Sequence, residues 1–134
     1  MGKVYVGRTP GIHLDDQGRQ QAEVLAERLA QKPIHKIFSS PLERCQETAA
    51  PLAKRFNLEI QIADALTEID FGDWTNKTPQ ELAPLEKWRQ WTSFRSGCVP
   101  LDLFRRIEIT PAAVSIISIS DQGPKILGVN ECLA

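Results

Sequence analysis

The chain has 134 residues, which is the length of a single domain with a core of its own. Its formal net charge is −1, with 42% hydrophobic and 25% charged residues, which excludes a strongly basic nucleic-acid or membrane-surface protein. No apolar run approaches the length of a membrane span, and Cys45, Cys98 and Cys132 are widely separated without metal-ligand spacing. We therefore expect a cytoplasmic protein with no metal, no cofactor, and neither nucleic acid nor a membrane as partner.

The N-terminal part predicts a loop followed by a helix. Glycines and prolines interrupt residues 1–14, and Asp15 is a good N-cap for the helix that follows. Pro33 ends that helix. Its predicted buried face consists of Ala22, Leu25, Ala26 and Leu29.

The next stretch predicts a short buried strand that turns directly into a second helix. Residues 34–38 supply the apolar run of the strand. Ser40 and Glu43 have the spacing of a capping box, with Pro41 at the first helical position. The apolar stripe of this helix is predicted to contain Leu42, Cys45, Ala49, Leu52, Ala53 and Phe56.

Arg44 falls in the first turn of that helix, off the apolar stripe. A cation there opposes the helix dipole, whereas an anion bound at the same end would reverse the sign of the interaction. A guanidinium beside free backbone N–H groups suits phosphate in particular. The residues alone leave two interpretations open, a phosphate ligand or a surface arginine that tolerates a small dipole penalty.

The middle of the chain predicts a second strand, a polar turn and an interrupted helix. Residues 58–62 alternate apolar and polar side chains, as in a half-buried strand. Residues 66–74 are typical of a polar turn whose aromatic side chains pack inward. A helix is predicted from Pro79 onward, capped by Thr78 or Asn76.

The last third predicts an aromatic helix face, a short helix and a hairpin. Trp88 and Trp91 have helical spacing and are interpreted as core residues. Residues 100–106 predict the short helix. Residues 114–119 and 125–129 predict two antiparallel strands around a turn.

The stretch from Ser39 to Ala49 reads Ser-Ser-Pro-Leu-Glu-Arg-Cys-Gln-Glu-Thr-Ala. It resembles the Ser-Ser-Pro-Leu-x-Arg-x-x-x-Thr-Ala segment of the histidine phosphatase superfamily, the phosphoglycerate mutase-like phosphatases. The resemblance implies that Arg44 binds the phosphoryl group being transferred and that Ser40 belongs to the substrate site.

Two further stretches resemble segments of the same family. Residues 66–74 resemble Leu-x-Glu-x-x-x-Gly-x-Trp, which implies that Glu68 is a proton donor in the phosphate pocket. A carboxyl group in that role needs a pKa raised by burial or by a nearby negative charge such as a bound phosphate. Gly7, Arg8 and Thr9 lie in a stretch that resembles the substrate loop.

The resemblance also indicates segments that this sequence lacks. Family members carry Arg-His-Gly at the end of the first strand and a later His-Gly motif, and neither occurs here. Residues 1–97 resemble the N-terminal part and residues 98–134 the C-terminal end, so we expect one incomplete domain, 1–134, with an internal segment missing. The implied fold is α/β, a three-layer α/β/α phosphoglycerate mutase-like fold without its two middle strands. A strand pair and a hairpin with exposed edges would remain.

The family reaction transfers a phosphoryl group from small phosphorylated metabolites through a phosphohistidine. Only His13 and His35 are present. His13 lies in the stretch that resembles the substrate loop and His35 precedes the predicted strand, so neither stands where the family carries a catalytic histidine. The resemblance therefore implies a truncated, inactive phosphatase. A non-catalytic module is the alternative: it would bind a phosphorylated small molecule or inorganic phosphate, or associate with a protein, a second copy included, through its exposed sheet edges. An incomplete reading frame is the third hypothesis.

Overall fold

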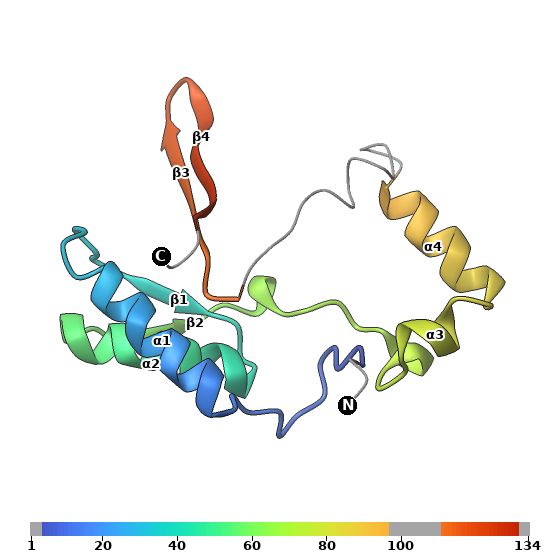
Figure 1. The fold of residues 1–134 in the computed structure, drawn as a ribbon. Helices are drawn as coiled ribbons and strands as arrows, with labels where there is room; N and C mark the ends of the chain where they lie inside the picture. Colours follow the sequence, from blue (N-terminus) through green and yellow to red (C-terminus); the bar gives the residue numbers. More distant parts are fainter. Residues whose placement is uncertain (1–3, 97–110, 132–134) are drawn as a thin grey trace.

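The computed structural model of the protein describes residues 4–96 and 111–131 (Figure 1). Its helices are α1 (Asp16–Arg28), α2 (Glu43–Phe56), α3 (Pro79–Leu82) and α4 (Glu86–Ser96). Its strands are β1 (Ile37–Ser39), β2 (Ile60–Ile62), β3 (Val114–Ser120) and β4 (Gly123–Glu131). Two short 3-10 helices, η1 (Asp64–Leu66) and η2 (Gly72–Trp74), lie between β2 and α3. The helix predicted at residues 100–106 lies outside the described residues. No helix in the described ranges is long and apolar enough to cross a membrane.

In the first half of the chain, α2 packs on a two-stranded parallel sheet and α1 packs on α2. Strand β1 pairs with β2, with Ile37 opposite Ile60, and α1 lies against α2 (Figure 1). The buried apolar residues of this part are Ala22, Ala26, Ile37, Leu42 and Ala53. The other edge of β1 pairs with no strand of the described residues. A strand pair of this kind is what the expected fold without its middle strands requires.

The start of α1 confirms the sequence prediction, whereas the start of α2 corrects it. The Asp15 carboxylate accepts a hydrogen bond from the Gly18 amide at 2.7 Å. Helix α2, however, begins at Glu43 with Leu42 as its N-cap and no side-chain cap. The Ser40 hydroxyl reaches only the Leu42 amide, at 3.4 Å. The predicted capping box does not form, because the chain bends through Pro41 and Leu42 before the helix starts and the Glu43 carboxylate binds elsewhere.

Helix α4 contributes two tryptophans to an aromatic cluster. Thr78 and Glu81 form a capping box at the start of α3, which confirms one of the two predicted caps. Of the two predicted core tryptophans, Trp88 is buried and Trp91 is half-buried, and Leu82 of α3 is fully buried. The rings of the aromatic cluster lie with centroids 5.0–5.9 Å apart in the contacting pairs. The cluster consists of Tyr5, Phe71, Trp74, Trp88 and Trp91.

Strands β3 and β4 form the predicted antiparallel hairpin, which extends away from the helices in Figure 1. Its end is tied to α1, because Arg28 Nη1 donates to the Glu131 carbonyl at 2.7 Å. Several large apolar side chains of the hairpin are exposed. They are Ile117, Ile119, Ile126, Leu127 and Val129. Each of the two sheets in the described residues has two strands, and each carries exposed apolar side chains.

Candidate phosphate site

The N-terminal residues 4–14, here called the entry loop, bridge α2 and the segment that precedes α3. At one end the Tyr5 amide donates to the Lys77 carbonyl at 3.0 Å, and the Asn76 amide donates to the Tyr5 carbonyl at 2.8 Å. Further along, the Gly11 amide donates to Glu43 Oε1 on α2 at 3.1 Å. The loop therefore lies across two elements that are far apart in the sequence.

Gly7 lies where the entry loop packs closely against Ile69 and Phe71. It is buried, its φ is +49°, and a Cβ built on it would lie 2.9 Å from Phe71 Cδ2 and 3.4 Å from the Ile69 carbonyl oxygen. Both the backbone conformation and the close approach favour glycine. The Gly7 carbonyl oxygen is thereby held where a side chain of α2 reaches it.

That side chain is Arg44. Its Nη2 donates to the Gly7 carbonyl at 2.9 Å. Its Nη1 is buried and has no hydrogen-bond partner among the described residues. A buried cationic N–H group without an acceptor carries a desolvation cost that an anion would offset, and the first turn of a helix favours the same charge. The half-buried guanidinium thus has one nitrogen anchored and one available to an anion.

Glu68 lies on the other side of the entry loop. Arg8 Nε donates to the Glu68 main-chain carbonyl at 2.5 Å, so the Gly7–Arg8 step links Arg44 to Glu68. The Glu68 carboxylate accepts a hydrogen bond from the Ile69 amide at 2.7 Å and is exposed. The sequence analysis named burial and a nearby negative charge as the two influences that suit a carboxyl group to proton donation. Glu68 is exposed, so a bound phosphate is the only one of the two that could act on it.

The other residues assigned by resemblance make local contacts. Ser40 is buried, and its contact to the Leu42 amide supports the bend before α2. The Thr9 amide donates to the Val6 carbonyl at 3.0 Å, which closes a turn of the entry loop. Gly7 and Arg8 are therefore the loop residues that the structure joins to Arg44 and Glu68.

Two glutamates of α2, to which the sequence analysis assigned no role at the site, hold the entry loop. Glu47 Oε1 lies 2.5 Å from His13 Nδ1, and Glu47 Oε2 accepts from the Leu14 amide at 2.8 Å. The Leu14 N–H and then the His13 contact lower the pKa of Glu47. The Gly11 N–H lowers the pKa of Glu43 in the same way. Glu43 and Glu47 are four residues apart on the helix that carries Arg44, so they lie on the same face of it, and this spacing was the signal by which the sequence could have paired them.

Among the described residues, no hydrogen bond or ion pair joins either histidine to Arg44 or to Glu68. His13 contacts Glu47, and its side chain is 53% exposed. His35 is exposed and precedes β1. No group of three or more His, Cys, Asp or Glu side chains suited to a metal ion occurs in the described ranges.

Comparison with known proteins identifies similar sequences. A protein of Mycobacterium tuberculosis, Rv0525, is 43% identical over 101 residues, which are 72% of this chain and 48% of that protein. Phosphoserine phosphatase 1 of Hydrogenobacter thermophilus is 36% identical over 91 residues, 64% of this chain and 43% of that enzyme. The chain thus spans just under half the length of these relatives.

Solved structures agree in fold. Phosphoserine phosphatase of Entamoeba histolytica, in complex with 3-phosphoglyceric acid, superposes with a TM-score of 0.76 at 17% identity, over 98% of this chain and 93% of that one. Mycobacterial glucosyl-3-phosphoglycerate phosphatase Rv2419c with inorganic phosphate gives a TM-score of 0.60 at 30% identity, over 69% of this chain and 44% of that one.

The sequence pattern of one family covers most of the chain, from residue 2 to residue 98. This range contains the Arg44 segment, the Glu68 segment and the entry loop. The chain belongs to the histidine phosphatase superfamily (branch 1).

Proposed function

We propose that this chain binds inorganic phosphate, or the phosphoryl group of a small metabolite, through Arg44, and that it does not hydrolyse phosphomonoesters by itself. The observation that carries the proposal is the buried Arg44 Nη1, which has no partner among the described residues while Nη2 is fixed on Gly7. A phosphate oxygen is the acceptor that such a guanidinium suits best. Family membership supports the same ligand class, because the relatives include phosphatases.

The absence of turnover is inferred from the chemistry of the family reaction. A histidine nitrogen must attack phosphorus, and the remaining residues of such a site recover only a small part of the rate enhancement once the nucleophile is gone. The sequence holds two histidines, one in contact with Glu47 and one exposed before β1. Neither makes a contact that would place it opposite the Arg44 guanidinium.

Thermal melting in phosphate or vanadate tests the binding part of the proposal. A ligand that binds the folded state stabilises it, by about 2.7 kcal/mol when the ligand is at 100 times its Kd, and thereby raises the melting midpoint. Arg44→Ala should remove the rise. Arg89→Ala is the matched control, since Arg89 is an exposed arginine that pairs with Glu86 on α4. An unchanged midpoint for the parent chain, or an equal rise in Arg44→Ala, would contradict the proposal.

A phosphomonoester assay tests the catalytic part. The purified chain should release no phosphate from p-nitrophenyl phosphate above the rate of a buffer blank. Turnover with a trapped phosphohistidine would refute the inactivity, and His13→Ala and His35→Ala would then show which imidazole reacts.

We also propose that the chain self-associates through its open sheet edges. The specific observation is a groove of about 440 Å³ beside β1 and α2, next to exposed Phe38 and Leu66, together with the apolar side chains of the β3–β4 hairpin. An unpaired strand edge beside apolar surface is a site for adding a strand. Sedimentation velocity over a concentration series should show a dimer that Ile119→Lys removes. A monomer at every concentration would refute it.

A further inference from the structure

We infer that Glu47 is a positioning residue of the proposed phosphate site, holding the entry loop against α2 so that the Gly7 carbonyl meets Arg44. This inference rests on the proposed function. It concerns a residue that would not touch the ligand, because the contacts of its carboxylate are with the loop and with α1.

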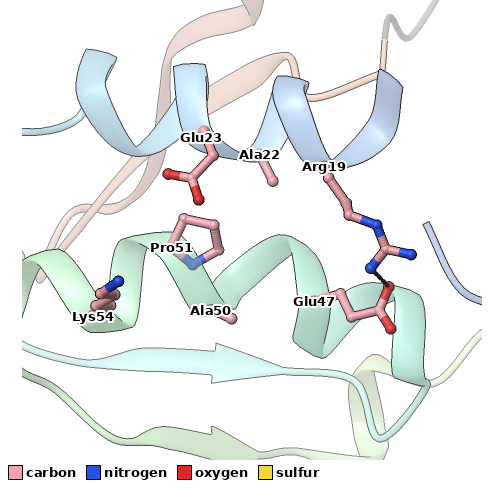
Figure 2. A pocket seen from close by; sticks show the side chains of 7 residues that line it. All are labelled: Arg19, Ala22, Glu23, Glu47, Ala50, Pro51 and Lys54. Carbon is pink, nitrogen blue, oxygen red and sulfur yellow. Dashed lines mark ion pairs between the residues drawn. The ribbon is translucent and has the colours of Figure 1, made fainter. Parts of the chain in front are cut away.

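The contacts of Glu47 converge from two segments. Oε1 contacts His13 Nδ1, and Oε2 accepts from the Leu14 amide at 2.8 Å. Arg19 Nη1 of α1 lies 3.7 Å from the same Oε2. Figure 2 shows Glu47 reaching from α2 toward Arg19 at one end of the groove between the two helices. Both oxygens of one carboxylate are thus used to hold the loop and α1 to α2.

The position of these contacts makes them decisive for the loop path. Tyr5 fixes the loop at the segment before α3, while Glu47 fixes it at Leu14, directly before the N-cap of α1. Between these anchors lie Gly7 and Gly11, whose φ angles of +49° and +72° place them in the region that glycine adopts freely. A segment with two such glycines takes its course from its anchors.

The second glutamate of α2 supports the loop less strongly. Glu43 accepts one hydrogen bond, from the Gly11 amide at 3.1 Å. Glu47 has three partners, which are His13 and Leu14 of the entry loop and the positively charged Arg19 of α1. Glu47 therefore contacts the loop at two residues and also holds α1, whereas Glu43 contacts the loop at one, so loss of Glu47 releases more of the loop than loss of Glu43.

The competing explanation is that Glu47 only stabilises α2 and has no influence on the site. The helix dipole favours acids in the first turn, but Glu47 lies beyond it, because α2 begins at Glu43. Its effect therefore runs through the loop contacts. The two explanations differ in the affinity of the fully folded protein for phosphate, which a purely structural residue would leave unchanged.

The first measurement is hydrogen exchange without ligand, on the parent chain, Glu47→Ala and Glu86→Gln. Glu86 is an exposed acid of α4 that pairs with Arg89, and its variant controls for the change in charge. Glu47→Ala should accelerate exchange at Gly11, Leu14 and the Gly7 region by about 3- to 10-fold. Unchanged exchange there would overturn the inference.

The second measurement is the Kd for inorganic phosphate, at a temperature where every variant is folded by circular dichroism. Thr78→Ala serves as the control for stability, because it removes the cap of α3, where the Thr78 side chain hydrogen-bonds with Glu81. Glu47→Ala should raise the Kd by about 5- to 10-fold, Glu47→Gln by less, and Thr78→Ala not at all. A Kd that Glu47→Ala leaves at the parent value would overturn the positioning role while Arg44 binding stands. A parent chain that does not respond to phosphate would refute the proposed function, and with it this role of Glu47.

Discussion

Gly7→Ala tests the packing of the entry loop more sharply than any other single change. Gly7 has a φ of +49°, and an added Cβ would lie 2.9 Å from Phe71 Cδ2. The left-handed backbone costs an alanine about 1–2 kcal/mol. The Phe71 ring is held between Tyr5 and Trp91, at centroid distances of 5.4 and 5.9 Å, so displacing it adds an overpacking cost of about 1–3 kcal/mol.

Gly11→Ala is the matched control. Gly11 also has a positive φ, +72°, but a Cβ there would meet nothing within 4 Å. Both alanines restrict the unfolded chain equally, so that effect cancels in the comparison. The difference between the two variants is therefore the steric cost alone, about 1–3 kcal/mol or roughly 4–12 °C in Tm.

Urea and thermal denaturation measure this difference, and phosphate titration measures its effect on the site. Gly7→Ala should be less stable than Gly11→Ala and should bind phosphate more weakly, because the carbonyl that anchors Arg44 moves. Equal stability of the two variants would refute the packing of Gly7 against Phe71. Normal phosphate affinity in a destabilised Gly7→Ala protein would refute the link to Arg44.

Further measurements address the rest of the molecule. Leu82→Ala, at a fully buried position, should cost about 2–5 kcal/mol in urea denaturation, and Leu85→Ala, 37% exposed, clearly less. Thr78→Ala should cost about 1 kcal/mol by removing the cap of α3, and no loss of stability would contradict the capping box. The folded-state pKa values of Glu43 and Glu47 are lowered, so the unfolded chain binds more protons near their ordinary value of 4.5. Their stabilisation is complete above that pH and is lost as the pH falls through the lowered values; the Tm between pH 6 and pH 3 should fall less in Glu47→Gln.

Local signals in the sequence predicted most of the elements. Asp15 was predicted as a cap, and Thr78 as one of two candidate caps, because an N-cap needs only a side-chain oxygen close to the first free amides of the helix. The strands at Ile37 and Ile60 followed from apolar patterning. The prediction of a capping box at Ser40 was wrong, because the Ser-x-x-Glu spacing does not reveal whether the helix starts at Pro41 or two residues later, at Glu43.

The candidate site depended on contacts between distant parts of the chain. Arg44 was predicted to be an anion ligand from its motif, but its anchor on Gly7 joins residues 37 apart, which no periodicity reveals. Glu47 stands inside the same motif, yet the role we infer for it depends on its contacts with His13 and Leu14, which the sequence does not show. The position of Phe71 over Gly7 was likewise unreadable, because it follows from the pairing of Tyr5 with the segment before α3.

The aromatic cluster has a spectroscopic consequence. The three tryptophans and the single tyrosine of the chain all belong to it, so intrinsic fluorescence monitors the region where α4, η2 and the start of the entry loop pack together. Far-ultraviolet ellipticity also reports α1 and α2, which contain no tryptophan or tyrosine. If the two signals melt at different temperatures, the halves of the molecule unfold separately, and no single free energy of unfolding describes the chain.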